Sequence, residues 1–174
     1  MVTGRSLLQL LVAAILACAA ALSCAQSPAH LQRGKDFAAL AKEARARQAP
    51  IVIAFVRQSC GYCAIAKRDY LVPMEREAGA QGKVIVREVD IEQGGTLSDF
   101  GGRATNPKAF SLRYRVGIVP TVVVVDDRGE LVAPPIVGLL SDDFYGSYLQ
   151  QAIEAGRVRM RTAPRQGGTG GAGR

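Results

Sequence analysis

An apolar run that leads directly into two closely spaced cysteines constrains the fold of this chain more than any other feature. Residues 51–56 are continuously apolar between Pro50 and a short polar stretch, a pattern typical of a strand buried on both faces. The tetrapeptide Cys-Gly-Tyr-Cys at 60–63 follows at once and opens a stretch with helical periodicity. Two thiols at this spacing can close a disulfide across a single turn. The segment therefore predicts a reversible redox couple where a strand meets a helix.

The two cysteines are expected to play different parts in thiol chemistry. Cys60 would lie at the start of the helix, where unpaired backbone N–H groups and the helix dipole favour a thiolate and lower the pKa of a thiol. Cys63 would lie one turn further along and face the core. We therefore expect Cys60 to be the attacking nucleophile and Cys63 to be the resolving thiol.

A static structural disulfide and a metal site are the alternatives for this cysteine pair. A tetrahedral zinc site needs four ligands, whereas the chain after residue 25 offers the two cysteines and His30. Two-coordinate binding of a soft metal such as copper is chemically possible, and so is a non-enzymatic module that holds a client through the pair. The preferred hypothesis is catalysis by the thiols, with no metal ion and no cofactor.

The first 25 residues have the pattern of a secretory signal peptide, with Arg5 ahead of an apolar stretch over 7–17 and small residues up to Ala25. The apolar stretch is shorter than the ~20 residues that a membrane-spanning helix needs. We therefore expect cleavage after Ala25, which would remove Cys18 and Cys24 and leave one cysteine pair.

An exported chain with one cysteine pair differs from a disulfide-stapled scaffold, which carries several pairs in a shorter chain. The pair is therefore predicted to be catalytic, in a protein that is periplasmic or secreted. Cys18 and Cys24 each follow small residues in an imperfect match to the lipidated cysteine of bacterial lipoproteins. A lipoprotein anchored to the membrane and facing the periplasm is therefore the alternative for localisation.

The formal net charge of +7 is concentrated at the C-terminal end. Five arginines and no acid follow Glu154, and Arg5 is expected to leave with the signal peptide, so residues 26–156 hold 16 basic and 15 acidic side chains. The folded part is therefore nearly neutral, which does not indicate a nucleic-acid partner. We predict a signal peptide at 1–25, a linker at 26–33, one domain at 34–156 and a basic, glycine-rich disordered tail at 157–174.

Helical and strand patterns alternate along the first part of the predicted domain. A glycine-rich loop over 91–106 is long enough to suggest function or mobility. The expected helices lie over 34–48, over 60–78 with a kink or interruption at Pro73, and from Asn106-Pro107 onward. The expected strands lie over 51–56, 84–89 and 121–125.

The last part of the predicted domain is a hairpin followed by a helix. A turn at 126–129 joins the strand at 121–125 to a returning strand at 130–137. Ser141 is expected to cap a last helix that ends before Gly156. These patterns together predict an α/β fold with a central mixed sheet flanked by helices. The apolar face of the last helix is expected to hold Phe144, Tyr148, Leu149, Ala152 and Ile153, and Phe110 and Tyr114 are also expected in the core.

Two motifs in this order resemble the thioredoxin family, over roughly residues 34–156. The strand with its Cys-Gly-Tyr-Cys tetrapeptide is the first motif, and Gly-Ile-Val-Pro-Thr at 117–121 is the second. The resemblance implies a thioredoxin-like fold in which Pro120 has a cis peptide bond beside the cysteines and Val119 offers its backbone to a bound substrate. It also implies substrate contacts from Gly61, Tyr62 and Thr121.

The resemblance implies an exported thiol–disulfide oxidoreductase, but its two parts differ on the direction of electron flow. Cys-Gly-Tyr-Cys resembles the motif of some periplasmic disulfide isomerases. The segment 117–138 is more similar to reducing thioredoxins and to thioredoxin-like domains of periplasmic electron carriers. We give the longer segment more weight and expect a reductase of disulfides in client proteins, regenerated by a membrane thiol–disulfide electron carrier. An isomerase or an oxidase is the alternative with the same chemistry.

The sequence departs from the thioredoxin pattern at two positions beside the cysteines. Ala54 takes the strand position where thioredoxins usually carry a buried acid that assists proton transfer to the second cysteine. Ser59 replaces the usual tryptophan before the first cysteine. Proton transfer must therefore use water or another group, and the candidates are Glu88, Asp90 and Lys67.

Overall fold

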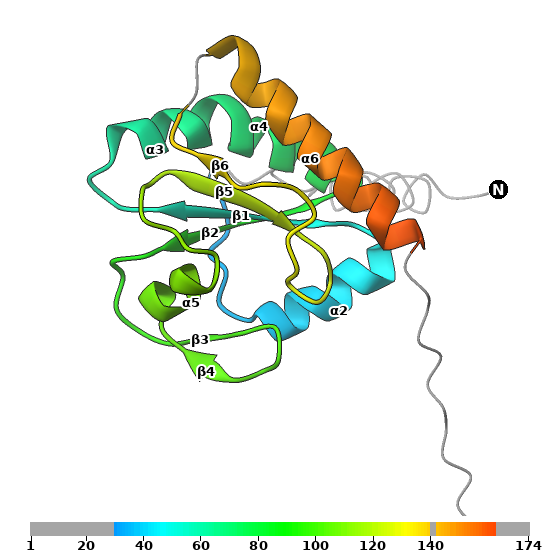
Figure 1. Cartoon of the computed structure of the whole chain (residues 1–174), viewed down its shortest axis with the longest axis horizontal. Helices are drawn as coiled ribbons and strands as arrows, with labels where there is room; N and C mark the ends of the chain where they lie inside the picture. Colours follow the sequence, from blue (N-terminus) through cyan, green and yellow to red (C-terminus); the bar gives the residue numbers. More distant parts are fainter. Residues whose placement is uncertain (1–29, 140–141, 163–174) are drawn as a thin grey trace, which may run out of the picture.

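We describe a computed structural model that covers residues 30–139 and 142–162 of the 174-residue chain (Figure 1). A central mixed β-sheet lies between two helical layers, which confirms the fold class predicted from the sequence. The predictions for the signal peptide, for Cys18 and Cys24, for the Ser141 cap and for residues 163–174 lie outside the described residues.

The central sheet has four strands in the order β2-β1-β5-β6. β1 (Ile51–Val56) lies inside the sheet, parallel to β2 (Ile85–Asp90) and antiparallel to β5 (Thr121–Val125). β6 (Ile136–Val137) is antiparallel to β5 at the edge. All six residues of β1 are buried, which explains why its apolar run is unbroken.

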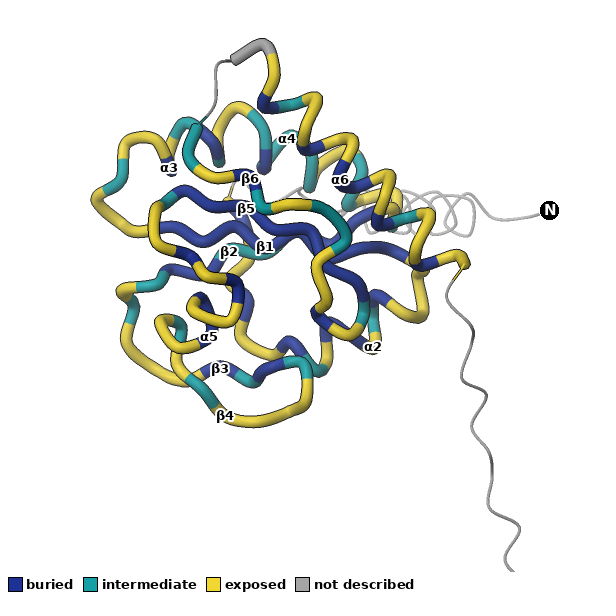
Figure 2. Tube along the Cα trace, viewed as in Figure 1, coloured by how far each residue is buried: buried dark blue, intermediate teal, exposed yellow. Residues whose placement is uncertain are grey.

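Helices cover both faces of this sheet, so that its strands form the buried centre of the molecule (Figures 1 and 2). α6 (Asp142–Thr162) and the helical stretch after the cysteines lie over one face, and α2 (Phe37–Arg47) and α5 (Pro107–Arg113) lie over the other. As predicted, α5 begins after Asn106, whose side chain accepts the N–H of Ala109 at 2.8 Å.

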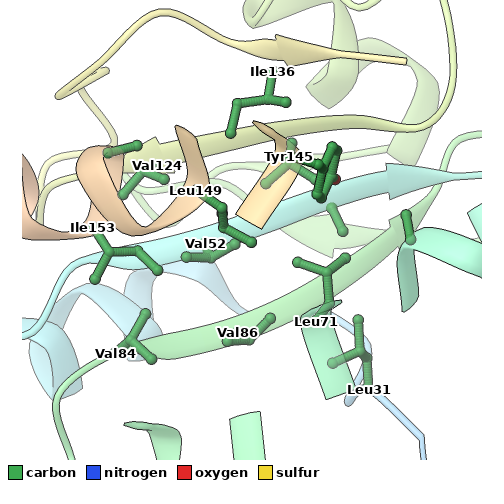
Figure 3. Packing of buried hydrophobic residues seen from close by; sticks show 14 of the residues in the cluster. Leu31, Val52, Leu71, Val84, Val86, Val124, Ile136, Tyr145, Leu149 and Ile153 are labelled. Carbon is green, nitrogen blue, oxygen red and sulfur yellow. The ribbon is translucent and has the colours of Figure 1, made fainter. Parts of the chain in front are cut away.

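Alternate side chains of β1 enter two separate cores. Val52 and Ala54 belong to the first core, beneath α6 and the helical stretch after the cysteines (Figure 3). Ile53 and Phe55 belong to the second core, which α2 and α5 cover. The predicted core positions Phe110 and Tyr114 are confirmed in this second core: they are 2% and 6% exposed.

The helical stretch after the cysteines runs from Gly61 to Gly79 without a break, but it departs from a regular α-helix on both sides of Pro73. Proline has no amide hydrogen, so it cannot donate the backbone hydrogen bond that a regular helix needs at that position. The stretch contains π-helical turns, which are wider than α-helical ones, both before and after the short α4 that holds Pro73. In chain order its parts are α3 (Gly61–Ala66), the π-helix η1 (Lys67–Leu71), α4 (Val72–Met74) and the π-helix η2 (Glu75–Gly79).

The glycine-rich segment that was predicted to be a loop contains a small hairpin. β3 (Leu97–Ser98) and β4 (Ala104–Thr105) are antiparallel. Between them, the carboxylate of Asp99 accepts the backbone N–H groups of Gly101 and Arg103, both at 2.9 Å. This buried carboxylate satisfies the backbone of the turn, which gives the segment regular structure despite its glycines.

The predicted end of the last helix before Gly156 is wrong, because α6 continues to Thr162. Gly156 is buried, and a Cβ atom added to it would lie 2.7 Å from the Cβ of Pro50. The glycine therefore allows α6 to approach the start of β1 closely instead of ending the helix. Met160 is 8% exposed and joins the second core, so the fold extends beyond the predicted domain boundary at residue 156.

The buried face of α6 also differs from the predicted one. Phe144 and Tyr148 are 58% and 49% exposed, so the prediction that they lie in the core is wrong. Tyr145 is fully buried instead and lies in the first core with Leu149 (Figure 3). The greater length of α6 explains the difference. Its buried face continues as far as Met160, and Tyr145 and Leu149 lie on that face, so Phe144 and Tyr148 point toward solvent.

The returning strand predicted over 130–137 is wrong for most of its length. Only Ile136–Val137 pairs as a strand, and Leu131 forms an isolated bridge with Val125. Pro134 and Pro135 lie between these two contacts and have no N–H to donate to a neighbouring strand, so the ladder cannot be continuous.

The predicted linker over 26–33 is shorter than expected, because its end belongs to the fold. Leu31 is 6% exposed in the first core. The carbonyl of Gln32 accepts the N–H of Glu88 at 2.9 Å, and the N–H of Gly34 donates to the carbonyl of Glu88 at 2.8 Å. These bonds satisfy backbone groups that β2 would otherwise expose at the edge of the sheet.

We predict that Gly156→Ala lowers the free energy of unfolding by about 1–2 kcal/mol, because overpacking against Pro50 outweighs the roughly 1 kcal/mol that alanine gains in a helix. The matched variant Ala155→Gly, at an exposed neighbouring position, should cost about 1 kcal/mol through helix propensity alone. Urea titrations of both variants measure these values. A more stable Gly156→Ala protein would contradict the close approach.

Candidate active site

The two cysteines form a disulfide at the point where β1 leads into α3. Their Cα atoms are 5.2 Å apart, within the usual range for a disulfide. Cys60 is the N-cap residue of α3, and its sulfur accepts the backbone N–H of Cys63 at 3.1 Å. After reduction, the same N–H would stabilise a thiolate on Cys60.

Solvent reaches the two cysteines unequally. Cys60 is partly exposed, and its neighbours Ser59, Gly61 and Tyr62 are exposed, Tyr62 to 67%. Cys63 is 1% exposed and lies in the first core. A molecule that carries a disulfide can therefore approach Cys60 directly, whereas the sulfur of Cys63 is closed to solvent.

A loop from a distant part of the chain lies against the disulfide. The peptide bond between Val119 and Pro120 is cis, and the carbonyl oxygen of Val119 lies 3.9 Å from the sulfur of Cys60. The hydroxyl of Thr121 donates to the carbonyl of Ile118 at 2.7 Å, and Thr121 is only 2% exposed. Of the residues predicted to contact a substrate, Val119 therefore lies beside the cysteines, while Thr121 supports the loop from within.

An open hollow of about 600 Å³ lies next to this loop. Ile118, Val137 and Leu131 line it and are 62%, 48% and 39% exposed. They were not predicted as site residues, because residue type alone does not separate an exposed apolar side chain from a core one. The available signal was the alternation of a strand, in which Val137 must face away from the buried Ile136.

The structure brings together two of the three polar residues that were predicted as candidates for proton transfer. Glu88 is paired with the fully buried Ala54 in the parallel register of β1 and β2. The carboxylate of Glu88 lies 3.1 Å from Nζ of Lys67, which is on η1. Asp90 is 7% exposed, and its carboxylate accepts the backbone N–H of Glu92 at 3.0 Å, which commits it to the turn after β2.

In the two described ranges, 30–139 and 142–162, no group of three or more His, Cys, Asp or Glu side chains is placed to hold a metal ion. None of the helices in these ranges is both long enough and apolar enough to cross a membrane. His30, the one histidine of the chain, is exposed at the start of the described part.

Comparisons with known proteins agree with this geometry. A family described as the thioredoxin-like domain matches residues 37–153, and the chain therefore belongs to this family. Its fold places the disulfide between β1 and α3 and brings the cis-proline loop against it. The class of chemistry that follows is thiol–disulfide exchange. No curated protein matches the chain.

Solved structures to which this chain is similar include thioredoxins and an oxidoreductase. A structure described as DsbH oxidoreductase is 19% identical, with 74% of this chain and 88% of that chain covered and a TM-score of 0.54. The mitochondrial thioredoxin 3 of Saccharomyces cerevisiae is 17% identical, with 71% and 93% covered and a TM-score of 0.48. The thioredoxin of Fasciola hepatica is 22% identical, with 71% and 97% covered and a TM-score of 0.47.

We predict that iodoacetamide modifies Cys60 of the reduced protein at least about tenfold faster than Cys63, since reaction requires an accessible thiolate. Peptide mass spectrometry after a short exposure measures the ratio. A guanidinium-denatured sample is the control, in which the two cysteines should react at similar rates. Faster labelling of Cys63 in the folded protein would contradict the assignment of the nucleophile.

Proposed function

We propose that this protein is an exported thiol–disulfide oxidoreductase that reduces disulfides in client proteins. The observation that carries the proposal is the asymmetry of the disulfide. Cys60 is partly exposed at the start of a helix, while Cys63 is buried one turn further along. This arrangement suits a two-step exchange, in which the exposed thiol attacks the substrate and the buried thiol then resolves the mixed disulfide.

In the first step, the thiolate of Cys60 attacks one sulfur of a client disulfide and the other client sulfur leaves as a thiolate. This forms a mixed disulfide between Cys60 and the client. In the second step, the thiolate of Cys63 attacks the sulfur of Cys60 and the second client sulfur leaves. Two electrons pass from the protein to the client, and the protein ends with the disulfide seen in the structure.

The surface around Cys60 suits an extended client segment. The carbonyl of Val119 lies 3.9 Å from the sulfur of Cys60, and the exposed Tyr62 and Ile118 lie within two residues of these groups in the chain. A backbone carbonyl at this place can accept an N–H from the client. The hollow beside Ile118, which Leu131 and Val137 also line, can take a side chain that flanks the client cysteine.

The reducing direction and the location are part of the proposal. The segment 117–138 favours reduction through its similarity to reducing thioredoxins. The signal-peptide pattern of residues 1–25 favours the periplasm or the outside of the cell, with a lipoprotein facing the periplasm as the alternative. In such a compartment the dithiol needs an electron donor, for which a membrane thiol–disulfide carrier is the expected partner.

The reduction potential of the Cys60–Cys63 couple is the measurement that tests the direction. We expect a value near that of reducing thioredoxins, about −270 mV. Equilibration with glutathione or dithiothreitol buffers, read by thiol labelling, gives the potential. A value near about −120 mV, as for a strong oxidant, would overturn the reductase assignment and support an oxidase.

A second test separates catalysis from simple binding. Cys63→Ser should trap mixed disulfides with clients, because the second step then lacks its thiol. Non-reducing gels of protein extracted from the native compartment show these species, which dithiothreitol should release. The matched variant Cys60→Ser should trap none. If Cys63→Ser also traps none, a non-enzymatic module that binds a soft metal or a client becomes the better hypothesis.

A further inference from the structure

The second step of the exchange has a physical requirement that the site described so far does not meet. The thiol of Cys63 must lose its proton before it can attack, because the thiolate is the nucleophile. Cys63 is 1% exposed in the first core, to which Ala54 and Ala66 also belong. Apolar surroundings disfavour a charged thiolate. The proton therefore needs an acceptor inside the protein, and Ala54 cannot provide one.

Lys67 lies one helical turn beyond Cys63. The backbone N–H of Lys67 donates to the carbonyl of Cys63, which places the two residues on the same face of the helix. The side chain of Lys67 is 34% exposed, so its stem is largely covered by the protein. The helix thus carries a cation on the same face as the buried thiol, one turn further along.

Glu88 meets this cation from the neighbouring strand. Val84 and Val86 of the same segment face the first core, and the alternation of a strand directs Glu88 to that side too. Glu88 stands next to Ala54 in register, and its side chain is 14% exposed. The distance from Nζ of Lys67 to Oε2 of Glu88 is 3.1 Å. Glu88 therefore places a carboxylate on the strand beside Ala54, the position at which thioredoxins usually carry a buried acid.

We propose that Glu88 accepts the proton of Cys63 during the second step and that Lys67 then pairs with the resulting thiolate. The inference rests on the thiol–disulfide exchange proposed above. The proton passes from the sulfur of Cys63 to the carboxylate of Glu88, and the total charge of the three groups does not change. Lys67 keeps an anionic neighbour throughout, first Glu88 and then the thiolate. The thiolate attacks Cys60, the leaving sulfur carries away the electron pair, and Glu88 later returns its proton to solvent.

Three of the other titratable groups near this side of the sheet fit the role less well. Arg33 lies 3.9 Å from Oε1 of Glu88, but it is a cation and accepts no proton. Asp90 is committed to the backbone of Glu92. Tyr145 shares the first core, and within the described ranges its hydroxyl has no hydrogen-bond partner. Burial raises the pKa of Tyr145 to about 12, so at neutral pH it is protonated and is no base.

Ellman's reagent tests the proposal without a client protein. Cys60 of the reduced protein attacks the reagent and releases one thionitrobenzoate, and Cys63 then resolves the mixed disulfide and releases a second. Stopped-flow absorbance separates these two phases, and the first phase also reports that a variant is folded and reactive. Cys63→Ser should lose the second phase alone, which assigns that phase to Cys63.

We expect Glu88→Gln to slow the second phase by about 100-fold at neutral pH, within the range for general base catalysis, and to leave the first phase unchanged. The rate should recover as pH rises, because hydroxide then removes the proton. Glu88→Asp should restore part of the rate. Lys67→Gln, at a partly exposed position, should also slow the second phase, and the double variant should be less than additive because the pair acts as a unit.

Arg33→Gln, Asp90→Asn and Tyr145→Phe are the matched controls and should keep the second phase within about threefold of the unsubstituted protein. A second phase that is unchanged in both Glu88→Gln and Lys67→Gln overturns the proposal, as does an equal slowing of both phases. A large effect in Asp90→Asn or Tyr145→Phe alone would move the role to that residue. If the protein reduces no client but shows these two phases with this dependence, the proposed function fails while the inference stands.

Discussion

The burial of β1 on both faces is the constraint on which the rest of the structure depends. Its six residues are all buried, and alternate side chains enter the core under α6 and the core under α2 and α5. A strand in this position must leave the sheet at a defined edge, and β1 leaves it directly into the N-cap position of α3. The position of the Cys60 sulfur is therefore fixed by the packing of β1 in the two cores, most of which lies away from the site.

The site is built from segments that are far apart in the chain, and each contributes something that the others cannot. The helix after β1 provides a backbone N–H for the sulfur of Cys60 and buries Cys63. The loop before β5 brings the carbonyl of Val119 to 3.9 Å from that sulfur. β2 contributes Glu88, which meets Lys67 at the strand position next to Ala54. β1 has Ala54 where thioredoxins usually carry an acid, and the neighbouring strand β2 carries Glu88 beside it.

The sequence-based predictions are accurate where neighbouring residues decide the structure, and they fail where contacts between distant residues decide it. Elements that depend on local periodicity or local chemistry, such as the buried strand at 51–56 and the cap at Asn106, agree with the structure. The end and the buried face of α6 do not, because Gly156 contacts Pro50 and the helix runs on to Met160. Leu31 likewise joins the fold only because the edge of β2 is available to the segment before it.

The amino-acid sequence by itself determined the chemistry: a disulfide-forming pair at 60–63 between a buried strand and a helix, followed by a Val-Pro-Thr segment, in a thioredoxin-like fold. It also showed that Ala54 cannot act as an acid. The pairing of Glu88 with Lys67, on which our proposal for a replacement rests, was decided by the tertiary structure alone. Glu88 and Lys67 are separated by 21 residues and become partners only through the parallel register of β1 and β2 and the helix packed across them. A contact between residues this far apart in the sequence produces no periodic pattern from which it could be predicted.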